Sequence, residues 1–204
     1  MKPNTDYKKR DQLIKAARDE FIKKGYSKAS LRTICAKAGV TTGALYFFFE
    51  NKAELFSAVV DPSINELKEL LNKYFVEDAK YLASAASLED IEAAHNDASE
   101  LITSCVYKNQ DVFRLLLNRA ENTVYENALD DLARLIEGCI PSIVSALPGY
   151  TYDDFMVEFM ARITIDSYIN VIKREPDEKK AAEKLRKITR YLVRGWVKLV
   201  FVKE

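Results

Sequence analysis

A cluster of small and hydroxyl-bearing side chains near residue 42 has the chemistry to read a polar surface at close range. Thr42, Gly43 and Ala44 follow one another, with the phenol of Tyr46 and the ammonium of Lys52 further along. A threonine hydroxyl can hydrogen-bond a base edge, and threonine or alanine methyl groups can touch the methyl group of thymine. Phenol and ammonium groups are suited to phosphate oxygens. These groups match the chemistry of base edges and phosphates, provided that the fold presents them together on one exposed element.

Two short helices and the start of a third are predicted around this cluster. Ser30 is a hydroxyl N-cap for the first helix, and Gly39 suits the positive φ at its end. Thr41 caps the second helix, and Asn51 with Glu54 forms a capping box for the third. A helix, a tight turn with glycine and a second helix form the helix-turn-helix pattern, whose second helix enters the major groove.

A longer array of residues surrounds this pattern and carries a resemblance to a known family. The array is Ile14, Ala17, Phe21, Gly25, Tyr26, Ile34, Ala36, Ala38, Gly39, Val40, Gly43, Tyr46, Phe49, Lys52 and Leu55. In residue types and spacing it resembles the DNA-binding domain of TetR-family transcriptional regulators, over about the first quarter of the chain. It departs at Phe48, where the family usually carries a histidine near the DNA backbone. We predict that Phe47 and Phe48 pack, because duplex DNA offers no free base face.

The resemblance implies double-stranded operator DNA as a partner. The residues predicted to contact it are Arg32, Thr33, Thr41, Thr42, Gly43, Ala44, Tyr46 and Lys52. For Arg32 and Thr33 a solvated surface role is an equal alternative.

Charge is distributed unevenly along a chain whose formal net charge is zero. Residues 1–55 contain 12 Lys+Arg against 6 Asp+Glu, whereas residues 56–204 contain 19 against 25. A basic excess over the motif is the electrostatic footprint expected of a DNA-binding module.

Other classes of function find little support in the sequence. One histidine, no glycine-rich phosphate loop and no metal-ligand cluster argue against an enzyme, and we expect neither a cofactor nor a metal. Three widely spaced cysteines without a CxxC pattern, and a start without an apolar leader, favour a cytoplasmic protein. Apolar runs are too short to cross a membrane, so no membrane partner is expected.

The composition predicts an all-α fold, because 6 glycines and 5 prolines in 204 residues favour long helices. We expect residues 1–56 to form a three-helix helix-turn-helix domain that binds DNA. Residues 57–204 are expected to form a helical effector-binding and dimerisation domain.

The resemblance implies that the larger domain binds a small-molecule effector in a largely apolar pocket. Candidates are the polar or aromatic residues within its apolar stretches: Arg114, Asn118, Glu121, Tyr125 and Tyr168. Each has an ordinary alternative. Arg114 can extend to solvent, and Glu121 with Tyr125 can simply stabilise a helix.

The last helix carries an apolar stripe of Leu185, Ile188, Leu192 and Trp196. Such a stripe is typical of an ordinary core helix. Because TetR-like proteins dimerise through their last two long helices, we expect these residues at the interface of a homodimer.

Together these features predict a sequence-specific transcriptional regulator, a repressor released from its operator by a small-molecule effector. The alternative is a helical protein-interaction or structural protein with a degenerate helix-turn-helix. The two differ in one property, because a regulator binds duplex DNA with steep salt dependence.

Overall fold

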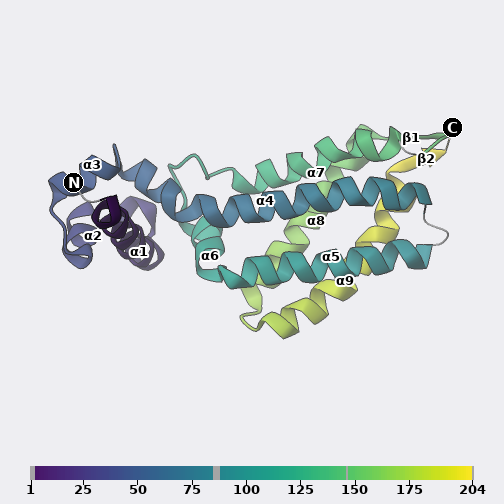
Figure 1. The fold of residues 1–204 in the computed structure, drawn as a ribbon. Coiled ribbons are helices and arrows are strands. Elements are labelled where there is room, and N and C mark those ends of the chain that lie inside the picture. Colours follow the sequence, from purple (N-terminus) through teal and green to yellow (C-terminus); the bar gives the residue numbers. More distant parts are fainter. Residues whose placement is uncertain (1–2, 85–87, 146, 204) are drawn as a thin grey trace. The chain divides into compact units, whose positions relative to one another are not determined.

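The computed structural model describes residues 3–84, 88–145 and 147–203, which are almost entirely helical (Figure 1). The helices are α1 Pro3–Lys28, α2 Leu31–Ala38, α3 Thr42–Phe48, α4 Lys52–Ser84, α5 Leu88–Lys108, α6 Gln110–Arg119, α7 Ala128–Ser145, α8 Asp154–Arg174 and α9 Glu178–Leu199. The all-α prediction is confirmed. The structure also contains two short strands that the sequence analysis did not predict, β1 Tyr150–Tyr152 and β2 Phe201–Lys203.

The chain divides into two compact units. Unit 1 contains the residues up to Asn65 together with Asn109–Glu126, and unit 2 contains Glu66–Lys108 and the residues from Asn127 onward. These units differ from the predicted domains 1–56 and 57–204, because α6 packs on α1. How DNA binding and effector binding divide between the two segments stays a prediction.

Unit 1 is built around an aromatic core. Phe21 and Phe56 meet edge to face, with their ring centroids 4.9 Å apart. Such a pair contributes about 0.5–1.5 kcal/mol beyond the burial of its area. Leu45 of α3 and Val112 of α6 are fully buried in the same cluster. The core therefore fixes one side of α3 and includes α6.

Two polar contacts attach α6 and the following turn to the rest of unit 1. The Arg18 guanidinium binds the Asp111 carboxylate through two bonds, Nη2 to Oδ1 at 2.6 Å and Nε to Oδ2 at 3.1 Å. Partial burial alone would raise the pKa of Asp111, but Arg18 and a backbone N–H lower it overall. Further along, the Tyr125 hydroxyl donates to Asp61 of α4 at 2.5 Å.

Unit 2 is a helical bundle in which α5 packs against α9, and α8 packs against both α7 and α9 (Figure 1). The two strands pair antiparallel, with Thr151 opposite Val202. The backbone N–H of Asp153 also donates to the carbonyl of Val200 at 3.3 Å. This ribbon links the residues before α8 to the end of α9.

Candidate DNA-contacting surface

The turn between α2 and α3 has the predicted helix-turn-helix geometry. The Ser30 hydroxyl accepts from the N–H of Thr33 at 3.4 Å, and Gly39 ends α2 in the left-handed region, at φ 67° and ψ 31°. The Thr41 hydroxyl then accepts from the N–H of Ala44 at 3.1 Å and caps α3. Because these caps satisfy backbone donors and acceptors that each helix end would otherwise leave unpaired, both short helices have defined limits.

A capping box fixes the start of α4. Asn51 Oδ1 accepts from the N–H of Glu54 at 2.9 Å. In return the Glu54 carboxylate accepts from the N–H of Glu50 at 2.6 Å, one residue before the predicted cap. The box sets the direction of α4 immediately after α3.

The outer side of α3 presents the residues that the sequence selected. Thr42 and Gly43 are exposed, Ala44 is half-buried, and the Tyr46 side chain is 53% exposed. A Cβ at Gly43 would meet no atom closer than 3.9 Å, so a partner can approach the backbone here. This side of α3 is open along its whole length.

Arg32 and Thr33 are both exposed on the first turn of α2. Thr41 is exposed too, with its hydroxyl oxygen engaged as the cap of α3. The structure thus brings the predicted residues of α2 and α3 into one solvent-facing helix-turn-helix. Whether each of them touches DNA stays a prediction.

Lys52 has partners within unit 1. Its Nζ donates to the carbonyl of Ser27 at 3.2 Å and lies 4.9 Å from the centroid of the Tyr26 ring. Partial burial lowers the pKa of Lys52. The end of α1 therefore orients this ammonium group at the start of α4.

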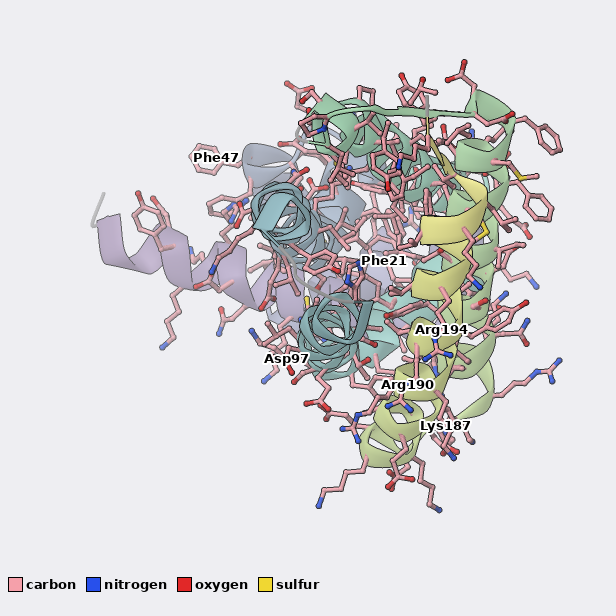
Figure 2. The ribbon with its side chains drawn as sticks, turned by 90° about the vertical axis from the view of Figure 1, so that its right-hand side faces the viewer. Phe21, Phe47, Asp97, Lys187, Arg190 and Arg194 are labelled. Atoms are coloured by element: carbon pink, nitrogen blue, oxygen red, sulfur yellow. The ribbon has the colours of Figure 1, made fainter. Side chains whose placement is uncertain are left out.

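The two phenylalanines of α3 have different environments. Phe48 is half-buried against the core of unit 1, as predicted. The packing prediction is wrong for Phe47, which is 67% exposed and points away from the ribbon (Figure 2). Phe47 follows the buried Leu45 by two residues, about 200° around an α-helix, so it lies nearly opposite the core-facing side. The spacing of Phe47 from Leu45 in the sequence would therefore have been enough to predict that Phe47 is exposed.

Four of the five predicted effector residues lie in unit 1. Asn118 is exposed and donates from Nδ2 to the carbonyl of Arg114 at 2.9 Å, and Arg114 is half-buried. Glu121 is exposed in the turns that precede α7, and Tyr125 lies in the same turns, so the two do not share a helix face. Burial and the bond to Asp61 raise the pKa of Tyr125 to about 12. The structure does not gather these four residues around one another.

Tyr168, the fifth, lies among hydroxyl groups in unit 2. Its hydroxyl is 2.8 Å from Ser99 Oγ of α5 and 3.0 Å from Thr189 Oγ1 of α9. Burial raises the pKa of the Tyr168 phenol although both neighbours hydrogen-bond to it. Nothing in the sequence pointed to Ser99 or Thr189, because they meet Tyr168 through tertiary packing.

The predicted interface stripe of α9 faces the interior of its own chain. Leu185 is 0% exposed and Leu192 is 4% exposed. Ile188 and Trp196 are half-buried, and the Trp196 indole donates to Thr164 Oγ1 at 3.1 Å. The stripe is therefore core-forming within a single chain, and its part in a dimer stays a prediction.

Other aromatic side chains on α8 and α9 are exposed. Phe155 and Phe159 are 69% and 46% exposed and stack with ring centroids 6.1 Å apart. Tyr191 of α9 is 76% exposed. Sequence reasoning selected α8 and α9 for the interface but assigned it to the α9 stripe rather than to these residues.

Two other kinds of site are absent from the described residues. No group of three or more His, Cys, Asp or Glu side chains among them is placed to hold a metal ion. None of the described helices is both long and apolar enough to cross a membrane.

Known proteins match the region of this surface. A family model described as bacterial regulatory proteins of the tetR family matches residues 13–59. The HTH-type transcriptional regulator TtgR of Pseudomonas putida is 45% identical over 62 residues, which are 30% of this chain and 29% of TtgR. The chain thus aligns with less than a third of that relative's length.

Solved structures extend the likeness to the fold as a whole. A transcriptional regulator of the TerR/AcrR family from Aquifex aeolicus has a TM-score of 0.64 at 18% identity, covering 90% of this chain and 99% of that one. SmeT from Stenotrophomonas maltophilia, in its complex with triclosan, has a TM-score of 0.60 at 18% identity, covering 96% and 92%. Such identities show the fold alone. The matched family model and the helix-turn-helix geometry agree over the same segment, so residues 13–59 are similar to bacterial regulatory proteins of the tetR family.

Proposed function

We propose that this protein is a sequence-specific DNA-binding repressor that acts as a homodimer and leaves its operator when a small molecule binds. The observation that carries the proposal is the capped helix-turn-helix, whose α3 is exposed along its outer side. Because a protein that binds operator DNA must reach the chromosome, the proposal also places this protein in the cytoplasm.

Two kinds of contact follow from the geometry. Thr42, Gly43 and Ala44 form the first turn of α3, where recognition helices meet base edges. We expect Tyr46 and Lys52 to contact phosphate groups, because a phenol and an ammonium can both donate to phosphate oxygens and Lys52 is the first residue of α4. Base contacts select the sequence, and phosphate contacts supply most of the salt-dependent affinity.

Salt-dependent binding to duplex DNA tests the proposal. Lys52→Ala should weaken binding to every duplex by a similar factor and reduce the slope of log K against log salt by about one. Thr42→Val should instead change the preferred sequence. The matched control is Lys108→Ala, a lysine of unit 2, which should leave both quantities unchanged. A wild-type protein without salt-dependent affinity for duplex DNA would favour the alternative, a structural or interaction protein.

The exposed aromatic side chains of α8 and α9 support a homodimer through these helices. Phe155, Phe159 and Tyr191 present apolar rings to solvent, and burial against a second copy would remove this area from water. A two-fold interface repeats the same surface on both copies, as tandem half-sites on DNA require.

An effector site is proposed within unit 2, with the Tyr168 hydroxyl as its polar anchor. Tyr168 of α8 meets α5 and α9 at one point, so a ligand that displaces Ser99 or Thr189 there would shift helix packing. The SmeT structure contains triclosan, which makes a small, largely apolar molecule the first class to screen.

A true effector must satisfy two linked measurements. It should raise the melting temperature of the free protein by mass action, and it should reduce the affinity for operator DNA. Saturating operator must then weaken effector binding by the same factor. Tyr168→Phe, which keeps the ring and removes the hydroxyl, should weaken binding of a polar effector. A compound that stabilises the protein without changing its affinity for DNA is a ligand but not the regulator.

A further inference from the structure

The recognition helix presents an apolar outer side to solvent. Residues Thr42–Phe48 contain no charged side chain. Phe47 is 67% exposed, and Gly43 and Ala44 precede it by four and three residues, so all three share one face of the helix. Tyr46 and Thr42 flank this face with hydroxyl groups. The bulky side chain at its centre is a hydrocarbon ring.

The neighbouring protein leaves the outer side of the Phe47 side chain uncovered. Its ring touches Phe48 edge to face, with centroids 5.0 Å apart, while Phe48 itself packs against the core. Phe48 thereby supports one side of the Phe47 ring and limits its freedom. The other side of the ring faces outward (Figure 2).

The major groove offers one apolar group to such a ring. Guanine, cytosine and adenine present hydrogen-bond donors and acceptors, whereas thymine adds the C5 methyl group. A phenylalanine ring cannot pair with donors or acceptors and would desolvate them at a cost. Contact with a thymine methyl buries apolar area on both partners instead.

We propose that Phe47 reads thymine C5 methyl groups in the major groove and so determines which half-site this protein prefers. The proposal rests on the proposed DNA-binding function and adds to it the chemical group that is recognised. The small side chains of Gly43 and Ala44 leave room beside the ring for the thymine edge to approach. Basic residues elsewhere in unit 1 supply the attraction to phosphate.

The experiment uses the full-length protein and a duplex selected by repeated rounds of binding from a random double-stranded library. Each thymine of that duplex is then replaced singly by deoxyuridine, which removes the methyl group and leaves base pairing intact. At one or two positions per half-site, this change should weaken wild-type binding about 3- to 10-fold, as expected for loss of one buried methyl contact. Affinity is measured by fluorescence anisotropy.

Phe47→Ala provides the second arm of the experiment. This variant should bind the thymine duplex more weakly than wild type and should no longer distinguish deoxyuridine at the sensitive positions. Because the Phe47 side chain is exposed, the melting temperature of the variant should equal that of the wild-type protein. Val124→Ala is the matched control, since Val124 is 80% exposed in unit 1 but outside α3; it should keep the full deoxyuridine effect.

The outcomes separate this inference from the function on which it rests. A protein that selects no duplex overturns both. Selective binding without any deoxyuridine effect overturns the role of the methyl group alone. A deoxyuridine effect that persists in Phe47→Ala assigns the methyl contact to another residue, and equal weakening by Phe47→Ala on all duplexes assigns Phe47 to the sugar–phosphate backbone.

Discussion

Gly39 illustrates how much one residue contributes to the DNA-contacting surface. Its backbone is left-handed, and a Cβ added there would meet no atom within 4 Å. Any penalty for a side chain is therefore conformational rather than steric. Since the residue also closes α2 through its N–H, its conformation determines how the chain enters α3.

We predict that Gly39→Ala lowers the free energy of unfolding by about 1–2 kcal/mol, the usual penalty for a side chain in the left-handed region. Urea denaturation followed by circular dichroism measures the change. Gly138→Ala is the control, and it should change the free energy of unfolding in the opposite direction. Gly138 lies inside α7 with open space around it, so alanine should stabilise by about 0.5–1 kcal/mol. Equal effects at both positions would contradict the role of backbone conformation.

Tyr125 gives a prediction that depends on pH. Its pKa is raised from 10.0 to about 12 in the folded protein, so folding favours the protonated phenol. The associated stability is fully present below pH 10 and is lost as pH rises towards 12. Tyr125→Phe should remove this part of the alkaline loss and should destabilise the protein at pH 7 by about 1–3 kcal/mol, because a hydrogen bond to a carboxylate disappears.

The free energy of unfolding of the wild-type protein and of Tyr125→Phe is measured by chemical denaturation at pH 7, 10 and 11.5. The difference between the two proteins should shrink as pH increases, whatever other tyrosines and lysines titrate. A constant difference across this range would show that the Tyr125 hydroxyl does not act through Asp61.

At the scale of elements, α6 belongs structurally with the helix-turn-helix. Val112 and Leu115 lie in the core of unit 1, and Arg18 joins α1 to Asp111 at the start of α6. The side chains of this pair are 38% and 41% exposed, so solvent screens their attraction. The buried residues must therefore supply most of the attachment.

A double-mutant cycle of Arg18→Met and Asp111→Asn should measure a coupling of about 0.5–1 kcal/mol at pH 7, typical of a partly exposed ion pair. Because the folded protein lowers the pKa of Asp111 below 3.8, this coupling is present above that pH and disappears as pH falls through the folded value. Val112→Ala is the comparison and should cost about 0.5–3 kcal/mol at both pH values. A coupling unchanged at acid pH would contradict the ionic nature of the contact.

The sequence predicted local features well and long-range ones poorly. Ser30, Gly39 and Thr41 were assigned correctly because each cap is decided by residues within four positions along the chain. The return of α6 to α1 and the meeting of Tyr168 with Ser99 depend on contacts 69 to 93 residues apart. No periodicity encodes such contacts, so the effector candidates of residues 114–125 were assigned to the larger domain from their position in the sequence alone.

The β1–β2 ribbon was missed for a related reason. Each strand has three residues, which is too short for an alternating pattern to be distinguished from a loop. Its pairing partners are separated by more than forty residues along the chain. Short sequences acquire this structure only because α8 and α9 bring them together.

At the scale of the whole molecule, the proposed dimer would bring two recognition helices to two half-sites. The buried stripe of α9 stabilises the single chain, whereas the exposed rings of α8 and α9 remain for a partner. A charge placed among these rings would have to be desolvated at the interface. The chain itself should tolerate that charge, because the site is open to solvent.

We therefore expect Phe159→Glu to give folded monomers with a wild-type melting profile at low concentration and at least tenfold weaker binding to a two-half-site operator. Sedimentation velocity measures the assembly state. Leu101→Glu is the control, since Leu101 is 60% exposed and lies on α5 rather than on α8 or α9; this variant should remain dimeric. Trp196→Glu should instead unfold the bundle, because the indole is half-buried and bonded to Thr164. A dimeric Phe159→Glu protein would place the interface elsewhere.

Helix α3 carries no charged side chain, and this affects how different DNA sites compete for the protein. Under the proposed function, attraction to DNA would come from lysines and arginines outside α3, and it would weaken at every DNA site alike as ionic strength rises. Hydroxyl and methyl contacts with bases release no counterions when they form. The preference for one DNA sequence over another therefore does not depend on salt as the total affinity does. A shift in the cell's salt would therefore change the total amount of protein on DNA while the rank order of its sites stays the same.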